Sequence, residues 1–208
     1  MSREVPAWLQ PLAAAAAELR PDELSRFHPP ADGGRPSAVL VLFADGPTGP
    51  EVLLIERAST MRSHAGQPAF PGGAADPGDG GPVGTALREA AEEVGLDSAS
   101  VQVITTLPAL WLPPSGFVVT PVLAWWHTPH AVRALDPAEV AAVALVPITE
   151  LVDPANRTNV LHPSGYVGPA FDVSGMLVWG FTAGLLDRLL ASGGWALPWD
   201  TSRLHRVR

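Results

Sequence analysis

The sequence predicts an α/β/α arrangement, in which helices cover both faces of a β-sheet. Short apolar or alternating runs bounded by glycine and proline, which are typical of strands, recur from Ser37 to Pro147. Two longer segments, Val83–Val94 and Gly175–Leu190, instead carry apolar residues at helical spacing. The 208 residues are enough for one sizeable domain, and the chain shows no internal repeat and no clear second domain.

The first part of the chain is expected to form a lead-in and then a strand hairpin. Residues 1–36 contain an alanine-rich helical stretch that Pro21 ends, and we expect this lead-in to pack as a cap on the surface of the main domain. The apolar run Ser37–Ala44 predicts a buried strand, and Glu51–Arg57 predicts the returning strand. Residues 46–50 supply the turn between them.

The remaining elements follow from similar patterns. We expect strands at Val101–Leu107, Phe117–Trp126 and Ala141–Pro147, a short helix at Ile148–Val152 and a hairpin within Asn156–Asp172. Pro121 has no donor N–H, which predicts an edge position or a bulge for its strand. Pro108–Gly116 is expected to be a loop that is unusually rich in apolar residues. We expect the helix Gly175–Leu190 to pack opposite the first helix. The main domain would then span residues 37–191, with 192–208 as a peripheral tail.

Three carboxylates in the first predicted helix carry the chemistry. Glu89, Glu92 and Glu93 stand at positions i, i+3 and i+4, so they project from one face within one turn. Like charges at this spacing repel, and a divalent cation would remove the conflict. Mg²⁺ suits a carboxylate cluster together with substrate phosphates. The preceding turn Pro71-Gly72-Gly73 lets the backbone come close to a ligand or a metal.

The segment Arg88–Leu96, REAAEEVGL, resembles the core of the Nudix box, usually written G-x5-E-x7-R-E-U-x-E-E-x-G-U with U a bulky apolar residue. The match has three departures. Asp79 stands where the pattern has glutamate, eight residues instead of seven separate it from Arg88, and Ala90 is a small occupant of the first U position.

The same shift is typical of the coenzyme A pyrophosphatase branch, whose upstream signature is similar to L-L-T-x-R-(S/A)-x3-R-x3-G-x3-F-P-G-G. This chain has Leu53–Ala58, Arg62, Gly66 and Phe70–Gly73 at the matching positions, and only Ile55 departs, from threonine. The segments Ser115–Val122 and Val178–Gly184 also resemble this branch, so the resemblance spans about residues 37–190.

The resemblance implies a Nudix-type α/β/α sandwich with a mixed β-sheet and metal-dependent hydrolysis of a diphosphate bond. The matching positions assign the metal, Mg²⁺ or Mn²⁺, to Glu89, Glu93 and Glu92, with the Gly73 carbonyl completing its ligands. Arg88 would orient the carboxylates. The general base stays open between Glu89 and Glu139, an acid in the turn before the strand at 141–147.

The glycine turn and the segment before it are the candidate substrate site. Arg57 and Arg62 offer a planar fork of donors to phosphate, and Gly66, Gln67 and Gly72 lie beside them in the sequence. His64 either contacts the substrate or is an ordinary hydrogen-bonding residue of a surface loop. Trp111, in the apolar loop, either stacks on an adenine or lines a pantetheine channel, or is buried beneath the loop.

In the coenzyme A branch the products are 4′-phosphopantetheine and adenosine 3′,5′-bisphosphate. Two alternatives remain. One is a Nudix hydrolase of another nucleoside diphosphate derivative, such as ADP-ribose or NADH. The other is a domain that binds nucleotide without turnover, against which the three intact acids argue.

The composition limits the classes of partner that we expect for this protein. The net charge of −8 argues against a nucleic-acid binder, and no run of 18 apolar residues indicates a membrane span. The absence of cysteine excludes disulfides and thiolate metal sites and fits a reducing, cytoplasmic location. We therefore expect a small coenzyme A-like nucleotide as the partner, no nucleic acid and no membrane. Because the tail at 192–208 could supply an interface, a homodimer stays an alternative.

Overall fold

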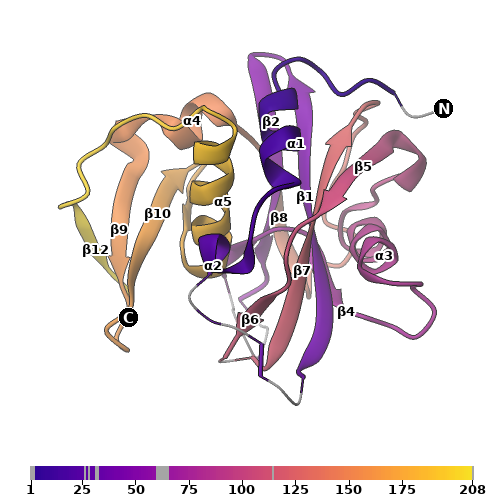
Figure 1. The fold of residues 1–208 in the computed structure, drawn as a ribbon, viewed down its shortest axis with the longest axis horizontal. Coiled ribbons are helices and arrows are strands. Elements are labelled where there is room, and N and C mark those ends of the chain that lie inside the picture. The colour runs from indigo at the N-terminus through magenta and orange to yellow at the C-terminus, as the bar shows by residue number, and fades with distance from the viewer. Residues whose placement is uncertain are drawn as a thin grey trace.

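The computed structural model describes residues 3–25, 27, 29, 30, 33–59, 66–113 and 115–207. Its central strand is β1 (Arg35–Gly46), which is apolar on both faces. Leu40 and Leu42 belong to one hydrophobic cluster, while Val41 and Phe43 belong to another on the opposite face. A strand buried on both sides must lie between two layers, and helices supply both of them (Figure 1).

The main sheet contains β1 and seven further strands. They are β2 (Gly49–Arg57), β3 (Pro68–Ala69), β4 (Gly72–Ala74), β5 (Val101–Thr106), β6 (Leu110–Leu112), β7 (Phe117–Trp126) and β8 (Val140–Pro147). The pair β1–β7 is parallel, and the other pairs in this sheet are antiparallel. The sheet is therefore mixed, which confirms the expected fold class.

The segment with β3 and β4 enters between β1 and β2. These two strands pair only near their turn, from Phe43–Val52 to Gly46–Gly49, so the turn is tighter than the predicted 46–50. Further along, β3 pairs with β2 and β4 pairs with β1. The glycine turn is thus fixed on both sides by main-chain hydrogen bonds, which makes it a firm base for a site.

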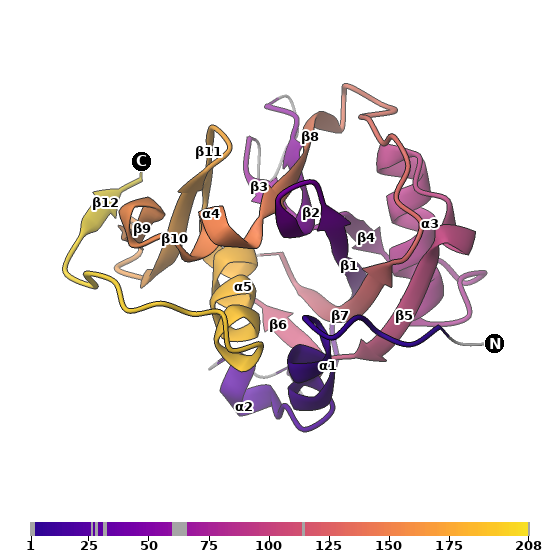
Figure 2. The same cartoon turned by 90° about the horizontal axis from the view of Figure 1, so that it is seen from above.

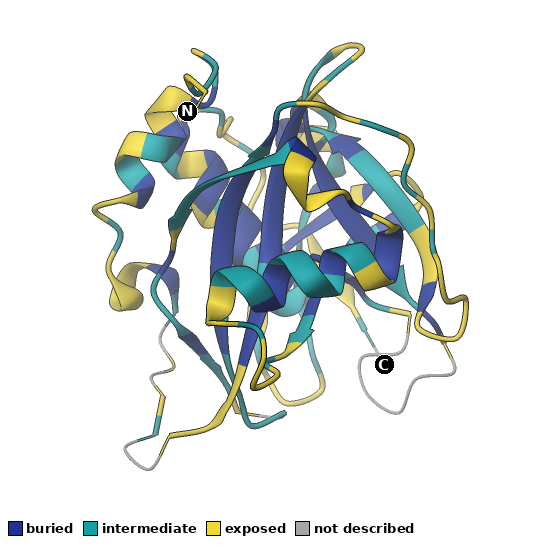
Figure 3. Cartoon of the chain, turned by 90° about the vertical axis from the view of Figure 1, so that its right-hand side faces the viewer, coloured by how far each residue is buried: buried dark blue, intermediate teal, exposed yellow. Residues whose placement is uncertain are grey.

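Helices cover the two faces. Helix α3 (Pro82–Val94) packs on one face through Ala86, Ala90 and Val94. Helices α1 (Gln10–Ala16) and α5 (Gly180–Ser192) pack on the other, as expected for the second long helix (Figures 2 and 3). The shorter helices are α2 (Pro21–Leu24), α4 (Ile148–Val152), η1 (Ser98–Ser100) and η2 (Pro154–Asn156). In the described part of the chain, no helix is long and apolar enough to span a membrane.

The lead-in is more than a surface cap. Leu9 and Leu12 are fully buried in the same cluster as Phe43 and the apolar face of α5. The Trp8 indole donates to Asp45 Oδ1 at 2.7 Å, and its ring lies 6.4 Å from the ring of Trp195 in the tail. Both ends of the chain therefore help to close the main core.

A second sheet lies beyond α5, in the order β11 (Met176–Val178), β10 (Val167–Val173), β9 (Arg157–Leu161) and β12 (Leu204–Arg206). The expected hairpin is β9–β10. The predicted helix Gly175–Leu190 is wrong at its start, because Ser174 and Gly175 have φ values of 50° and 75° and turn the chain back on β10 as β11. The tail, which supplies β12, is also less peripheral than expected.

Two predictions around β7 are corrected. The strand is central, with β1 on one side and β5 and β6 on the other, so Pro121 does not mark an edge. Pro121 is tolerated because β6 pairs with residues up to Val119 and β5 pairs from Val122 onward, which leaves a gap between them. The predicted apolar loop contains β6. In it Trp111 is half-buried, and its ring packs so close to Gly34 that a methyl group there would clash.

Candidate functional site

Helix α3 directs its acids toward the glycine turn. Pro82 begins the helix, and Gly95 ends it in a left-handed conformation at φ 73°. Ala86, Ala90 and Val94 fix one side of the helix against the sheet. The next row of side chains, which includes Glu89 and Glu93, then faces β4.

Glu93 is a buried carboxylate. It is 6% exposed, and its Oε2 accepts a hydrogen bond from the Gly72 amide at 3.0 Å. Burial raises the pKa of Glu93 to about 7, while the Gly72 amide and the charge of Arg57 oppose this and the charges of Glu89 and Glu139 add to it. A buried acid among like charges favours a proton or a cation beside it.

Glu89 lies against Gly73. A Cβ atom at Gly73 would stand 2.5 Å from the Glu89 carboxylate, so only glycine lets the acid approach the turn. Burial raises the pKa of Glu89, Arg88 opposes this, and the charges of Glu92 and Glu139 raise the pKa further. Glu89 and Glu93 therefore converge on the two glycines of β4.

Arg88 is the hub of the polar network. Its Nε donates to Asp79 Oδ1 at 2.7 Å, and its Nη2 donates to Asp79 Oδ2 at 3.1 Å and to the Ala74 carbonyl at 3.0 Å. Nη2 also lies 3.0 Å from Glu89 Oε1, and Nη1 lies 2.8 Å from Glu92 Oε2. The arginine thus links the loop, the turn and two acids of the helix, and its role in orienting the carboxylates stays a prediction.

Asp79 accepts two hydrogen bonds from Arg88 and is itself held by two further donors. Its Oδ2 accepts from the Thr85 hydroxyl and from the Asp76 amide, each at 2.8 Å. The Arg88 hydrogen bond holds the pKa of Asp79 well below its usual range. The aspartate that departs from the box pattern therefore still reaches the arginine.

Sequence reasoning missed two residues of this arrangement, Thr85 and Gly84. Gly84 lies in the first turns of α3, and a methyl group there would overlap the Asp79 carbonyl oxygen. The signal that could have found it is a glycine inside a predicted helix, which is costly unless another backbone approaches it.

The other two predicted acids, Glu92 and Glu139, are exposed at the edge of the site. The Glu92 side chain is 61% exposed and is paired with Arg88. Glu139 is exposed, but it lies close enough for its charge to raise the pKa of both Glu89 and Glu93. Its carbonyl accepts from the Ala58 amide at 2.8 Å, which fixes the turn beside the end of β2.

Arg57, the last residue of β2, lies next to the acids. Its charge lowers the pKa of Glu93, and its Nε is buried with no hydrogen-bond acceptor among the described residues. Backbone bonds join Arg57 to Gln67 and Gly66, and Gly66 has φ 67°. Of the predicted substrate residues, Arg57, Gly66, Gln67 and Gly72 are thus brought together. Arg62 and His64 lie outside the described residues.

The donor set fits a divalent cation. Among the described residues, no three acidic or histidine side chains are gathered as a ready metal site. Arg88 engages Glu89 and Glu92, and the Gly72 amide engages Glu93. Glu89 and Glu93 nevertheless repel each other where they are partly shielded from solvent. Carboxylate oxygens of this kind suit Mg²⁺ or Mn²⁺. The metal ligands remain a prediction.

Comparisons with known proteins identify the family of this chain. The family model of the NUDIX domain matches residues 34–164. The uncharacterized Nudix hydrolase NudL of Photorhabdus laumondii is 36% identical over 165 residues, which cover 76% of this chain and 84% of the relative. The protein of the same name from Cronobacter sakazakii is 40% identical over 162 residues, which cover 74% of this chain and 81% of the relative.

Solved structures show the same fold at low sequence identity. The Nudix hydrolase RenU from M. smegmatis has a TM-score of 0.56 at 20% identity, covering 83% of this chain and 96% of its own. The NUDIX hydrolase from Alicyclobacillus acidocaldarius has a TM-score of 0.50 at 21% identity, covering 80% of this chain and 93% of its own.

Proposed function

Since the chain belongs to the Nudix hydrolase family, we propose that its substrate is coenzyme A or a derivative of it. The protein is a pyrophosphohydrolase of a nucleoside diphosphate derivative. With coenzyme A, water attacks one phosphorus of the diphosphate and the bridging P–O bond breaks. The products are 4′-phosphopantetheine and adenosine 3′,5′-bisphosphate.

Members of this family generally use divalent metal ions, and we propose Mg²⁺ or Mn²⁺ here. When bound, the cation neutralises phosphate oxygens and makes water a better nucleophile. Glu89 and Glu93 would hold it, with the Gly73 carbonyl and Glu92 as further ligands. Arg88 keeps Glu89 and Glu92 in place through its contacts at 3.0 and 2.8 Å.

The observation that carries the proposal is Arg57 beside Glu93. Within the described part of the chain the buried Arg57 Nε has no acceptor, which is costly, and a phosphate oxygen would satisfy it. Arg57 also belongs to the upstream segment that resembles the coenzyme A branch, where we propose that it and Arg62 hold substrate phosphates. Glu139, at the rim and close to Glu89, is our candidate for the general base, and Glu89 is the alternative.

A substrate panel tests the proposal. Coenzyme A, dephospho-coenzyme A, ADP-ribose and NADH would be compared at equal concentration, with Mg²⁺ or Mn²⁺, for the wild type and Glu93→Gln. We expect coenzyme A to be cleaved best and Glu93→Gln to lose at least about a hundredfold in kcat. Preference for ADP-ribose or NADH would retain the metal site and reject the role given to Arg57 and the upstream segment.

A further inference from the structure

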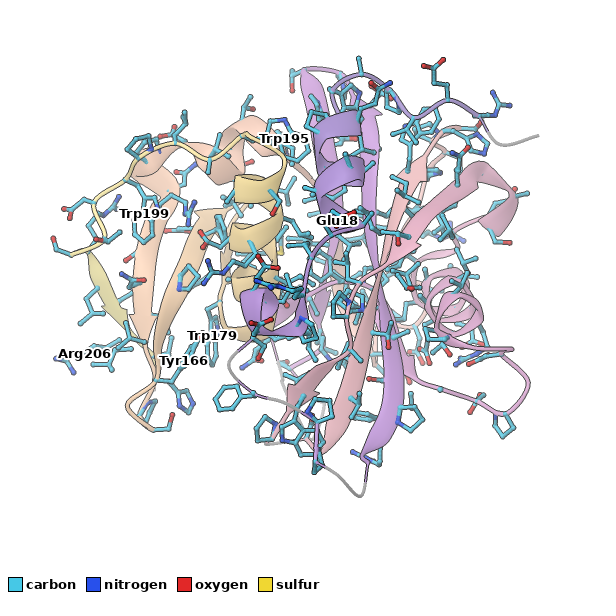
Figure 4. All side chains as sticks on the ribbon, viewed as in Figure 1. Glu18, Tyr166, Trp179, Trp195, Trp199 and Arg206 are labelled. Atoms are coloured by element: carbon cyan, nitrogen blue, oxygen red, sulfur yellow. The ribbon has the colours of Figure 1, made fainter. Side chains whose placement is uncertain are left out.

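Two aromatic rings form a stack on the second sheet, outside the site of Glu89, Glu93 and the glycine turn, which we call the acid site. Trp179 lies between β11 and α5, and its ring centroid lies 5.7 Å from that of His162, with 25° between the ring planes. Both side chains are only half-buried. Figure 4 shows Trp179 at the same end of this sheet as Tyr166, which follows His162 in the β9–β10 turn. Nothing in the acid site accounts for this stack.

The turn fixes the orientation of the histidine. The Ser164 amide points at His162 Nδ1 from 3.2 Å, and the Ser164 hydroxyl lies 2.8 Å from the same nitrogen. Because the amide can only donate, Nδ1 is the acceptor and the neutral ring carries its proton on Nε2. The stack therefore presents aromatic surface beside a ring N–H donor. That combination suits a planar base with acceptor nitrogens at its edge.

The stack is connected to the acid site through β3. Thr182, one turn into α5 from Trp179, donates its hydroxyl proton to the Pro68 carbonyl at 3.1 Å, and this contact is buried. Strand β11 also lies beside β3 (Figure 2). From Pro68 the chain runs directly to Gly72, the partner of Glu93, a span of at most about 14 Å. Strand β3 therefore links the sheet that carries the stack with the turn that holds Glu93.

We propose that the Trp179–His162 stack is the platform for the purine base of the substrate. In this arrangement the base stacks on the exposed part of the Trp179 indole, while the diphosphate reaches Arg57 and the acids of α3. The inference rests on the proposed function, since it assigns the base of that substrate to a place. It makes Trp179 a specificity-determining residue that leaves the chemical step untouched.

Fluorine NMR of the full chain labelled with 5-fluorotryptophan tests the platform without catalysis. The Trp179 resonance is the one lost in Trp179→Phe, and the Trp111 resonance is identified in the same way from Trp111→Phe. ADP, UDP and ribose 5-phosphate would be titrated in separate samples. We expect the Trp179 signal to shift with ADP, less with UDP and not with ribose 5-phosphate, and the Trp111 signal to stay in place.

Steady-state kinetics give the second readout. Trp179→Leu keeps an apolar side chain and removes the ring, so KM for coenzyme A should rise about tenfold at nearly constant kcat. Trp179→Phe keeps a ring and should restore most of the affinity. A purely structural role would change the Tm of the variants and leave KM unchanged.

The outcomes separate the two proposals. A Trp179 signal that ignores ADP, or an unchanged KM in Trp179→Leu, overturns the platform. A shift of the Trp111 signal with ADP, in place of the Trp179 signal, also overturns the platform and places the base beside β6. A Trp179 shift with ADP but no cleavage of coenzyme A overturns the proposed substrate and leaves the platform standing.

Discussion

Gly73 has no side chain at the point where the Glu89 carboxylate meets the glycine turn. Changing Gly73→Ala places a methyl group 2.5 Å from that carboxylate, so the acid must move. A displacement of about 1 Å can cost about a hundredfold in rate, and we expect a loss of at least that size in kcat. Gly78→Ala is the matched control, because a Cβ at Gly78 meets nothing within 4 Å. Equal activity of the two variants would show that the reaction does not need the Glu89 carboxylate to stand against Gly73.

Glu51, remote from this chemistry, is a buried acid whose titration affects stability. It is 8% exposed, and burial raises its pKa above the ordinary 4.5. Because the folded protein binds this proton more tightly than the unfolded chain, the contribution is full below pH 4.5 and is lost as the pH rises through the raised pKa. Glu51→Gln should therefore stabilise the protein relative to wild type at about pH 8 and not at about pH 4. Urea unfolding at both values measures this, and a less stable variant at the higher pH would contradict it.

At the scale of the element, α3 depends on the loop packed against its first turns. Alanine normally stabilises a helix interior by about 0.5–1 kcal/mol over glycine. At Gly84 the methyl group would instead overlap the Asp79 backbone, and we expect a loss of about 1–3 kcal/mol together with lower activity. Gly184→Ala, in the middle of α5 with open space around it, should give the ordinary gain. Chemical denaturation compares the two, and a stabilised Gly84→Ala variant would show that the loop does not need this contact.

The same helix shows what a sequence can predict. The limits of α3, its end at Gly95 and the shared helix face of Glu89 and Glu93 follow from local spacing. The segment 176–178 has helical spacing yet forms β11, because the turn at Ser174 brings it back to β10 and tertiary pairing outweighs periodicity. The central position of Pro121 depends on a gap between two partner strands, which no local pattern reveals.

At the scale of the whole molecule, the site combines residues from distant parts of the chain. Arg88 and Glu89 are neighbours in the sequence and were predicted together, whereas Asp79 was noted only as a departure from the box pattern. The approach of Arg57 to Glu93 depends on β2 splitting from β1 to admit β3 and β4. The Trp179–His162 stack depends on a second sheet of which the sequence indicated only the β9–β10 hairpin. Long-range pairing of strands is what periodicity leaves undetermined.

The face of the main sheet opposite α3 is closed by the two ends of the chain, so the lead-in should matter for global stability. Leu12 is fully buried in the cluster that includes Phe43 and α5, and Leu12→Ala should cost about 2–5 kcal/mol. Because α3 packs on the other face, kcat of the folded protein should stay near that of the wild type.

Leu197→Ala, at a side chain that is 49% exposed in the tail, is the control and should change stability by less than about 0.5 kcal/mol. Urea unfolding and kcat would be measured on both variants. A loss below about 1 kcal/mol for Leu12→Ala would restore the simpler view of the lead-in as a loosely attached cap.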